Sequence, residues 1–315
     1  MLHAFLINPR AGKPGAAKKA AQTIEAACRA LGLTYTLTLT ESPGDAVRIT
    51  RHYAQSDQAI RLYACGGDGT LNQVVQEAAG QENLAVTNIP LGTGNDFLKL
   101  FGEDYKKSFW DLHALAEGPQ TAMDLIDCNG VLGLDIVCAG IDARVAADVD
   151  RYKALPLVGG MGAYALSLAA NVVFKPLAQP MTVELGGQAW DEPITLVCVC
   201  NGRYYGGGFM PSPDALPDDG ELEFILVPGV RKRDFLGLVG KYAKGRAAEL
   251  EGVAHIYKGP GPVTLRADRP ITAVADGEVL SDELLTIGLS EKKLNFFWPV
   301  GASYRVEKEP VGAAL

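Results

Sequence analysis

Over its first hundred residues the chain alternates short apolar runs with helical segments, and this alternation constrains the fold more than any other feature. After the third run, for example, Leu71, Val74, Val75 and Ala78 recur at the i, i+3, i+4, i+7 spacing of one helix face. Such alternation predicts a parallel sheet with helices on both faces, and ligands bind such sheets at the carboxyl ends of the strands. The apolar runs are His3–Ile7, Thr34–Thr40, Ala59–Cys65 and Leu84–Ile89.

From about Met123 the pattern changes to short strand-like runs separated by Gly, Pro, Asp and Asn. These runs predict a mostly antiparallel β-sandwich as a second domain. Because 315 residues are many for one hydrophobic core, two domains are expected on length as well. We predict an α/β domain over residues 1–123, with a return of the chain at about 290–315, and a β-rich domain over 124–289.

The formal net charge of −8 argues against non-specific nucleic-acid binding. No secretory signal is visible at the N-terminus, and the six cysteines show no paired spacing, so we expect buried, reduced thiols in a cytoplasmic protein. The stretch Ala154–Phe174 carries no charge, but Pro156 and several glycines interrupt it. We expect a buried helix around Ala163–Phe174 rather than a membrane span.

The turn Gly66-Gly67-Asp68-Gly69-Thr70 lies between a buried strand and a helix. Glycines allow the backbone to approach a phosphate closely, and the N–H groups at a helix N-terminus attract it. A carboxylate there would repel phosphate unless a cation intervenes, so Asp68 indicates Mg²⁺ between the turn and the phosphates. The alternative is a tight turn in which Asp68 caps the helix.

Two further bends follow neighbouring strands. The bend Pro90–Phe97 contains Gly92, Thr93 and Gly94, with Asn95 or Asp96 as a helix cap, and the bend Asn8–Lys13 follows the first strand. Lys13 lacks the spacing of a P-loop. Small-residue bends at the ends of successive strands are stronger evidence for a phosphate site than one bend alone.

Two acidic turns stand out in the second part of the chain. Asp276-Gly277-Glu278 could supply a general base for a substrate hydroxyl, or could be an acidic hairpin turn. The segment Asp214–Glu221 could bind a hard cation through a carboxylate and carbonyls, or could be a solvated loop.

In their order along the chain, these motifs resemble the bacterial lipid kinases of the diacylglycerol kinase and sphingosine kinase superfamily. The segments that carry the resemblance are Gly66–Asn72, Pro90–Phe97, Asn201-Gly202, Tyr205–Phe209, Pro213–Gly220 and Asp276–Glu278. The resemblance covers nearly the whole chain. It implies an α/β nucleotide-binding domain, a β-sandwich lipid-binding domain and a cleft between them.

The resemblance also implies roles for particular residues. Glu278 would be the proton acceptor, with Asp276 beside it and Asp68 in the catalytic group. Asp219, with the carbonyls of Leu216 and Glu221, would hold a structural Mg²⁺, although an apolar residue is commoner at position 221. The predicted nucleotide-binding residues are Asn8, Pro9, Arg10, Ala11, Gly12, Thr40, Gly66, Gly67, Asp68, Gly69, Thr70, Leu71, Asn72, Gly92, Thr93, Asn95 and Asp96.

We therefore expect an ATP- and Mg²⁺-dependent kinase that phosphorylates a hydroxyl of a membrane-derived lipid, with diacylglycerol as the first choice. A cytoplasmic enzyme of this kind would contact the membrane surface transiently. NAD kinase-like phosphorylation of a soluble nucleotide and a non-catalytic lipid sensor are the alternatives. The physiological lipid and homodimer formation stay open.

Overall fold

The structure is a computed structural model. It describes residues 1–305 apart from 93, 154–159, 247, 248, 250 and 251. The predicted nucleotide residue Thr93 and positions 306–315 of the predicted return to the first domain therefore lie outside the described residues.

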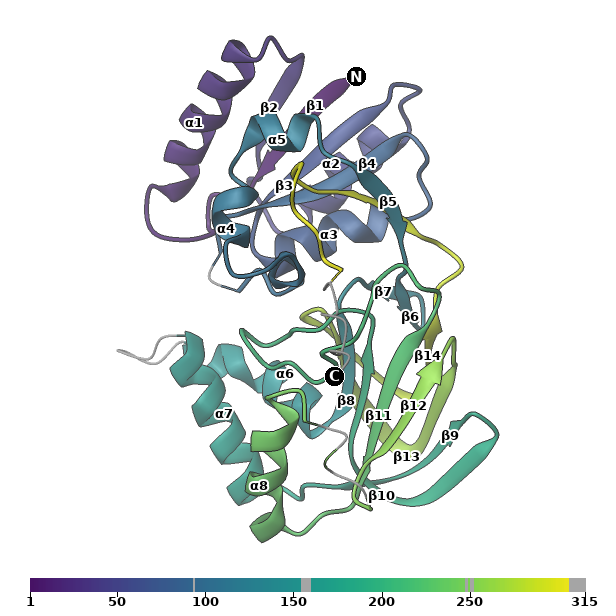
Figure 1. The fold of residues 1–315 in the computed structure, drawn as a ribbon. Helices are drawn as coiled ribbons and strands as arrows, with labels where there is room; N and C mark the ends of the chain where they lie inside the picture. The colour runs from purple at the N-terminus through teal and green to yellow at the C-terminus, as the bar shows by residue number, and fades with distance from the viewer. Residues whose placement is uncertain (93, 154–159, 247–248, 250–251, 306–315) are drawn as a thin grey trace, which may run out of the picture.

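The first sheet has the strand order β2-β1-β3-β4-β15-β5, in which all neighbours are parallel except β15 and β5. The chain passes from β1 to β2 in one direction across the sheet and from β2 through β3 to β4 in the other. Right-handed crossovers therefore place α1 on one face and α2 and α3 on the other (Figure 1). The strands are β1 (Leu2–Ile7), β2 (Tyr35–Leu39), β3 (Ile60–Gly66), β4 (Leu84–Pro90), β5 (Gln120–Met123) and β15 (Leu294–Phe297). The helices are α1 (Ala16–Ala30), α2 (Asp45–Ala54), α3 (Asp68–Ala78), the 3₁₀ helix η1 (Phe97–Phe101), α4 (Tyr105–Ser108) and α5 (Leu112–Ala116).

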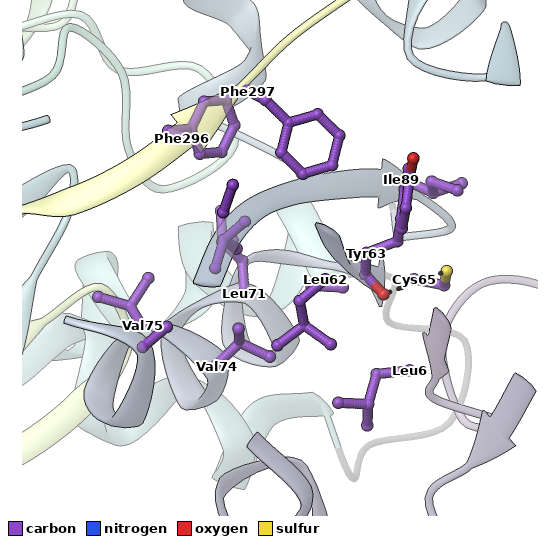
Figure 2. Close-up of a cluster of buried hydrophobic side chains, with 14 of the residues drawn as sticks. Leu6, Leu62, Tyr63, Cys65, Leu71, Val74, Val75, Ile89, Phe296 and Phe297 are labelled. Carbon is purple, nitrogen blue, oxygen red and sulfur yellow. Dashed lines mark hydrogen bonds between the residues drawn. The ribbon is translucent and has the colours of Figure 1, made fainter. Parts of the chain in front are cut away.

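The core of this part of the molecule packs on both faces of β3 and β4 (Figure 2). Val74 of α3 is fully buried, as is Phe297 of β15, whose ring meets that of Tyr63 edge-on at a centroid distance of 5.1 Å. The last strand of the chain thus contributes core side chains to the first sheet. Where the sequence indicated a helix over Asn95–Phe101, only the 3₁₀ turn η1 forms.

The second sheet is antiparallel throughout and runs β12-β11-β10-β8-β13-β14-β6-β7. Strands β8 and β9 both bridge β10 and β13, β8 at the C-terminal halves of these long strands and β9 at the N-terminal halves. The predicted runs Pro262–Arg266 and Ile271–Ala275 form one strand, β13, with a register shift between Arg266 and Ile271. The strands are β6 (Ile126–Cys128), β7 (Val131–Gly133), β8 (Ile136–Gly140), β9 (Gln179–Leu185), β10 (Gln188–Cys200), β11 (Leu222–Pro228), β12 (His255–Gly259), β13 (Val263–Ala275) and β14 (Glu278–Leu289).

Three helices, α6 (Ile141–Lys153), α7 (Gly160–Phe174) and α8 (Lys232–Tyr242), gather beside this sheet (Figure 1). The chain is thus a parallel α/β domain followed by a mostly antiparallel β-sandwich, as the sequence predicted. The six cysteines are buried, as the sequence predicted, and none forms a disulfide in the structure.

The expected buried helix over Ala163–Phe174 forms as α7, but it is buried on one face only. Leu166, Val173 and Phe174 are 42, 61 and 84% exposed. The prediction was wrong because a lack of charged residues does not mean that other parts of the protein cover a helix on all sides. Helix α7 packs mainly against α6. Within the described residues, no helix is long and apolar enough to cross a membrane.

Candidate active site

The three small-residue bends predicted from the sequence lie against one another at the carboxyl end of the first sheet. The Asn8 side-chain amide donates to the Thr70 hydroxyl at 3.0 Å, which joins the first bend to the glycine turn. The Gly66 carbonyl accepts the N–H groups of Leu91, at 2.9 Å, and of Gly92, which joins the turn to the second bend.

Glycine is required where these bends touch. A Cβ on Gly92 would lie 2.8 Å from the Cα of Gly67, closer than carbon atoms can pack. A Cβ on Gly12 would lie 2.5 Å from the Leu91 carbonyl oxygen, and the φ of Gly12 is +77°, which glycine adopts without strain. The glycines thus allow three backbone segments to meet without side chains between them.

Asp68 begins α3 and ties the glycine turn to the second bend. Its two carboxylate oxygens accept the backbone N–H groups of Asn95 at 2.8 Å and Asp96 at 2.6 Å. Burial, assisted by the negative charge of Asp96, raises the pKa of Asp68 to about 6. Within the described residues no basic side chain forms an ion pair with it.

The other predicted nucleotide residues fall into two groups. Pro9, Arg10 and Ala11 lie on the first bend with exposed or half-exposed surfaces, and the Thr40 N–H donates to the Ile7 carbonyl at 2.9 Å beside them. A second group is largely buried. It consists of Thr70, Leu71, Asn72 and Asn95, and Asn95 sits at φ +56° with its amide bonded to the Gly92 carbonyl.

A cleft of about 620 Å³ separates the two sheets, a size typical of small-ligand sites. Asp68, Gly69 and Asp96 line it from the first domain, and Asp276 and Glu278 line it from the second. The turn between β13 and β14 therefore faces the glycine turn across the cleft, so the structure brings the predicted catalytic carboxylates together.

Asp276 and Glu278 differ in their surroundings. The Asp276 carboxylate accepts three consecutive backbone N–H groups, from Leu134 at 2.6 Å, Asp135 at 3.1 Å and Ile136 at 2.9 Å. Burial raises its pKa even though these N–H groups oppose the shift. Glu278 is exposed, and no hydrogen bond joins its carboxylate to any other residue that the structure describes.

Asp96 links the two domains. One of its oxygens pairs with the Lys99 ammonium, and the other accepts the Gly207 N–H of the second domain at 2.8 Å. The sequence prediction included Asp96 but missed Lys99. A lysine three residues after an aspartate at the start of a helix was the available signal.

The sequence reading also missed Asp135 and Asp142, which both line the cleft. Asp135 is 6% exposed, and burial together with the charges of Asp276 and Asp96 raises its pKa. Asp142 accepts a hydrogen bond from the Tyr205 hydroxyl, and burial raises its pKa to about 6. The available signals were Asp135 inside the strand-like run Gly133–Cys138 and Asp142 shortly after it.

The predicted second metal site lies away from this cleft. Asp219 accepts the Glu221 N–H at 3.1 Å, and the Lys258 ammonium lies 2.9 Å from the carboxylates of both Asp219 and Glu221. Leu216 packs against the core of the first domain. The Lys258 ammonium thus occupies the space between the two carboxylates, and a cation would have to displace it, so metal binding there stays a prediction.

Comparisons with known proteins agree with this architecture. Residues 3–128 match the model of the diacylglycerol kinase catalytic domain, and residues 135–296 match that of the YegS C-terminal NAD kinase beta sandwich-like domain. The combination defines a two-domain kinase.

Proteins of similar sequence specify the class of kinase further. A Pseudomonas aeruginosa protein named "Probable lipid kinase YegS-like" is 31% identical over 88% of this chain and 89% of its own. A Stenotrophomonas maltophilia protein of the same name is 27% identical over 87% of this chain and 89% of its own. A solved diacylglycerol kinase structure from Bacillus anthracis covers 96% of this chain and 98% of its own at TM-score 0.68 and 18% identity, which shows the shared fold. The chain belongs to the YegS-like family of lipid kinases.

Proposed function

We propose that the protein transfers the γ-phosphoryl group of ATP to a primary hydroxyl of a membrane-derived lipid, with diacylglycerol, which would become phosphatidic acid, as the first candidate. The observation that carries this proposal is a cleft with the glycine turn and the second bend on one wall and Glu278 on the other. The first bend is hydrogen-bonded to the glycine turn through Asn8 and Thr70. The bends supply backbone N–H groups for the phosphates, and the opposite wall supplies a base for the acceptor.

The negative charge of the cleft favours a cation that binds together with the nucleotide. Asp68, Asp96, Asp135 and Asp276 all line the cleft, and of these only Asp96 is paired with a basic side chain in the described part of the chain. Within that part, no group of three or more His, Cys, Asp or Glu side chains is placed to hold a metal ion. Mg²⁺ bound to ATP would neutralise developing phosphate charge, and Asp68 would hold it from the protein side.

Glu278 is the better general base of the two carboxylates in its turn. Its carboxylate is exposed to the cleft, whereas the carboxylate of Asp276 is occupied by three N–H groups. Glu278 accepts the proton of the acceptor hydroxyl while that oxygen forms a bond to the γ-phosphorus. The bond to the β–γ bridging oxygen breaks, ADP carries away the electron pair, and Glu278 passes its proton to solvent.

Asp276 positions the base rather than acting as one. By accepting the N–H groups of Leu134–Ile136 it fixes the turn against the start of β8, which sets the direction of the adjoining β14 strand. Most of the rate acceleration then comes from positioning and electrostatics.

The lipid chain would enter beside α7. Tyr164 lines both the cleft and an apolar pocket behind it, which Leu168 of α7 and Leu238 of α8 also line. That pocket has a volume of only about 30 Å³, so an acyl chain would have to separate α7 from α8. Tyr164 and Leu168 of α7 would thus line the path of the lipid chain.

The test is incubation of the purified protein with γ-labelled ATP, Mg²⁺ and a total lipid extract, followed by identification of the labelled species. We expect a labelled phospholipid, with diacylglycerol as the acceptor when pure lipids are compared. Labelled NAD in a parallel arm would instead favour phosphorylation of a soluble nucleotide. Retained labelling by Glu278→Gln would remove the assigned base.

A further inference from the structure

Helix α7 buries its polar side chains Ser167 and Asn171 and leaves several apolar side chains exposed. Ser167 and Asn171 are fully buried: the Ser167 hydroxyl donates to the Val145 carbonyl at 2.8 Å, and the Asn171 amide donates to the Asp148 carboxylate at 3.0 Å. The opposite face is apolar, and its exposed members are Ala165, Leu166, Ala169, Val173 and Phe174. A surface helix in an ordinary globular protein instead exposes its polar side chains and buries its apolar ones.

Basic side chains surround the C-terminal end of this face. Lys175 follows the helix, and Arg231, Lys232 and Arg233 open α8 beside it, where the Lys232 ammonium donates to the Val173 carbonyl at 2.9 Å. All four are exposed. The anions that face them are Asp148, paired with Lys175 at 2.7 Å, and Asp234, paired with Arg231 at 2.8 Å and Arg233 at 3.3 Å.

These four cations and two anions leave a local excess of positive charge on a chain whose net charge is −8. An apolar helix face with a basic border is the composition that lies in the headgroup region of an anionic bilayer. A second copy of the chain fits less well, because contact through the same face would bring two basic borders together.

The position of the face agrees with its composition. The same helix contributes Tyr164 to the wall of the cleft, and Figure 1 shows α7 at the outer flank of the second domain. A bilayer in contact with the outer face of α7 would therefore lie next to the entrance through which a lipid must pass.

We propose that the outer face of α7, formed by Leu166, Val173 and Phe174 with the basic border of Lys175, Arg231, Lys232 and Arg233, docks on anionic bilayers. The inference rests on the proposed lipid kinase function, since it supplies the surface from which the substrate enters. The apolar side chains enter the region between headgroups and acyl chains, and the basic side chains contact lipid phosphates.

The experiment is co-sedimentation of the full chain with vesicles of phosphatidylcholine alone or with added phosphatidylglycerol. We expect binding to the anionic vesicles that weakens with salt. The double variant Val173→Glu/Phe174→Glu should lower the affinity by about tenfold or more, because two exposed apolar groups become charged. Val300→Glu is the matched control, since Val300 is 55% exposed on the other domain, and it should bind as wild type.

Arg233→Glu separates the two contributions. It should lower affinity for anionic vesicles and reduce the salt dependence while leaving any weak binding to neutral vesicles unchanged. Wild-type protein that binds no vesicles, or a Val173→Glu/Phe174→Glu variant that binds them normally, would overturn the proposal. A wild-type dimer that this variant converts to a monomer would assign the face to a second copy instead.

Activity distinguishes failure of docking from failure of the proposed function. With diacylglycerol in vesicles, the double variant should be slowed in parallel with its loss of binding, whereas with a water-soluble short-chain diacylglycerol it should match wild type. Equal loss on both substrates would contradict a docking role. Absence of phosphorylation by wild type on either substrate would refute the proposed function while the vesicle measurement still decides docking.

Discussion

Individual carboxylates in the cleft differ in their surroundings, and the roles that we propose for them follow from these differences. The sequence placed Asp276 and Glu278 in one turn but could not assign the base, because residue type alone does not tell which carboxylate is occupied. The three N–H groups that bind Asp276 come from Leu134–Ile136, about 140 positions earlier in the chain. Asp135 was missed for the same reason, since its burial depends on contact between β8 and distant loops.

Replacement of the two carboxylates by amides should separate stability from turnover. Asp276→Asn loses an anionic acceptor for three N–H groups and should lower the free energy of unfolding by about 2 kcal/mol. Glu278→Gln should change it by less than ~0.5 kcal/mol and abolish phosphoryl transfer. Urea denaturation and the labelling assay measure the two effects. A stable, inactive Asp276→Asn would reverse the assignment.

The pKa of Asp68 predicts a pH limit for nucleotide use. Because burial and Asp96 raise this pKa to about 6, the carboxylate gains a proton as pH falls through that value and loses its charge toward Mg²⁺. We expect kcat/KM for MgATP to fall about tenfold per pH unit below this point. Asp142, whose pKa is also about 6, is the control: Asp142→Asn should keep the inflection. If the inflection disappears in Asp142→Asn, the pH dependence of kcat/KM belongs to Asp142 and not to Asp68.

Lys258 competes with the predicted cation at Asp219. Removal of the ammonium in Lys258→Met frees the carboxylates of Asp219 and Glu221, so Mg²⁺ without nucleotide should stabilise this variant at a lower concentration than wild type. A shift of about threefold is expected for a partly exposed ion pair. Thermal denaturation across a Mg²⁺ titration measures it, and Asp219→Asn/Lys258→Met should abolish the response. Identical titrations of wild type and Lys258→Met would argue against competition.

At the scale of elements, local patterns predicted most of the first domain. The runs that became β1 to β4 and the helix α3 were predicted from hydrophobic spacing, because the apolar residues of these elements are buried in the core. Helix α7 shows where such patterns fail. The apolar residues of α7 indicate that they avoid water, but they do not tell whether protein or a bilayer covers them. The burial of Ser167 and Asn171 depends on hydrogen-bond partners in α6, which a local pattern does not reveal.

The contact between the bends can be tested by two glycine substitutions. Gly92→Ala would force its Cβ within 2.8 Å of the Gly67 Cα and should cost about 1–3 kcal/mol of stability. Gly69→Ala adds a Cβ that meets no atom within 4 Å, so stability should not fall, although the methyl group on the cleft wall should weaken ATP binding. Denaturation and nucleotide titration of both variants provide the comparison. Equal stability of the two would show that the bends separate freely.

At the scale of the whole molecule, the order of the strands in each sheet defines the fold more than the number of strands does. The first sheet is completed by β15 (Leu294–Phe297), which lies between β4 and β5 although more than two hundred residues separate it from the end of β4 at Pro90. Hydrophobic runs predicted strands but not this pairing, because register between distant segments is set by the packed core. The prediction that the chain returns to the first domain at about 290–315 did not specify a position in the sheet.

Phe296 tests how strongly this return stabilises the molecule. Its ring is fully buried and meets that of Phe97 at a centroid distance of 5.1 Å. Phe296→Ala should lower the free energy of unfolding by about 3–5 kcal/mol, whereas Val300→Ala, at a 55% exposed position, should change it by less than ~0.5 kcal/mol. Urea titrations of both give the difference. A small effect of Phe296→Ala would mean that the first sheet is stable without β15.

The late position of β15 also has a consequence for biosynthesis. A ribosome releases the N-terminal strands long before Leu294–Phe297 leaves its exit tunnel, so during most of translation β4 is an unpaired edge and β5 has no neighbour in its sheet. The first domain must therefore wait, partly assembled, until Leu294–Phe297 has been synthesised before its sheet can close.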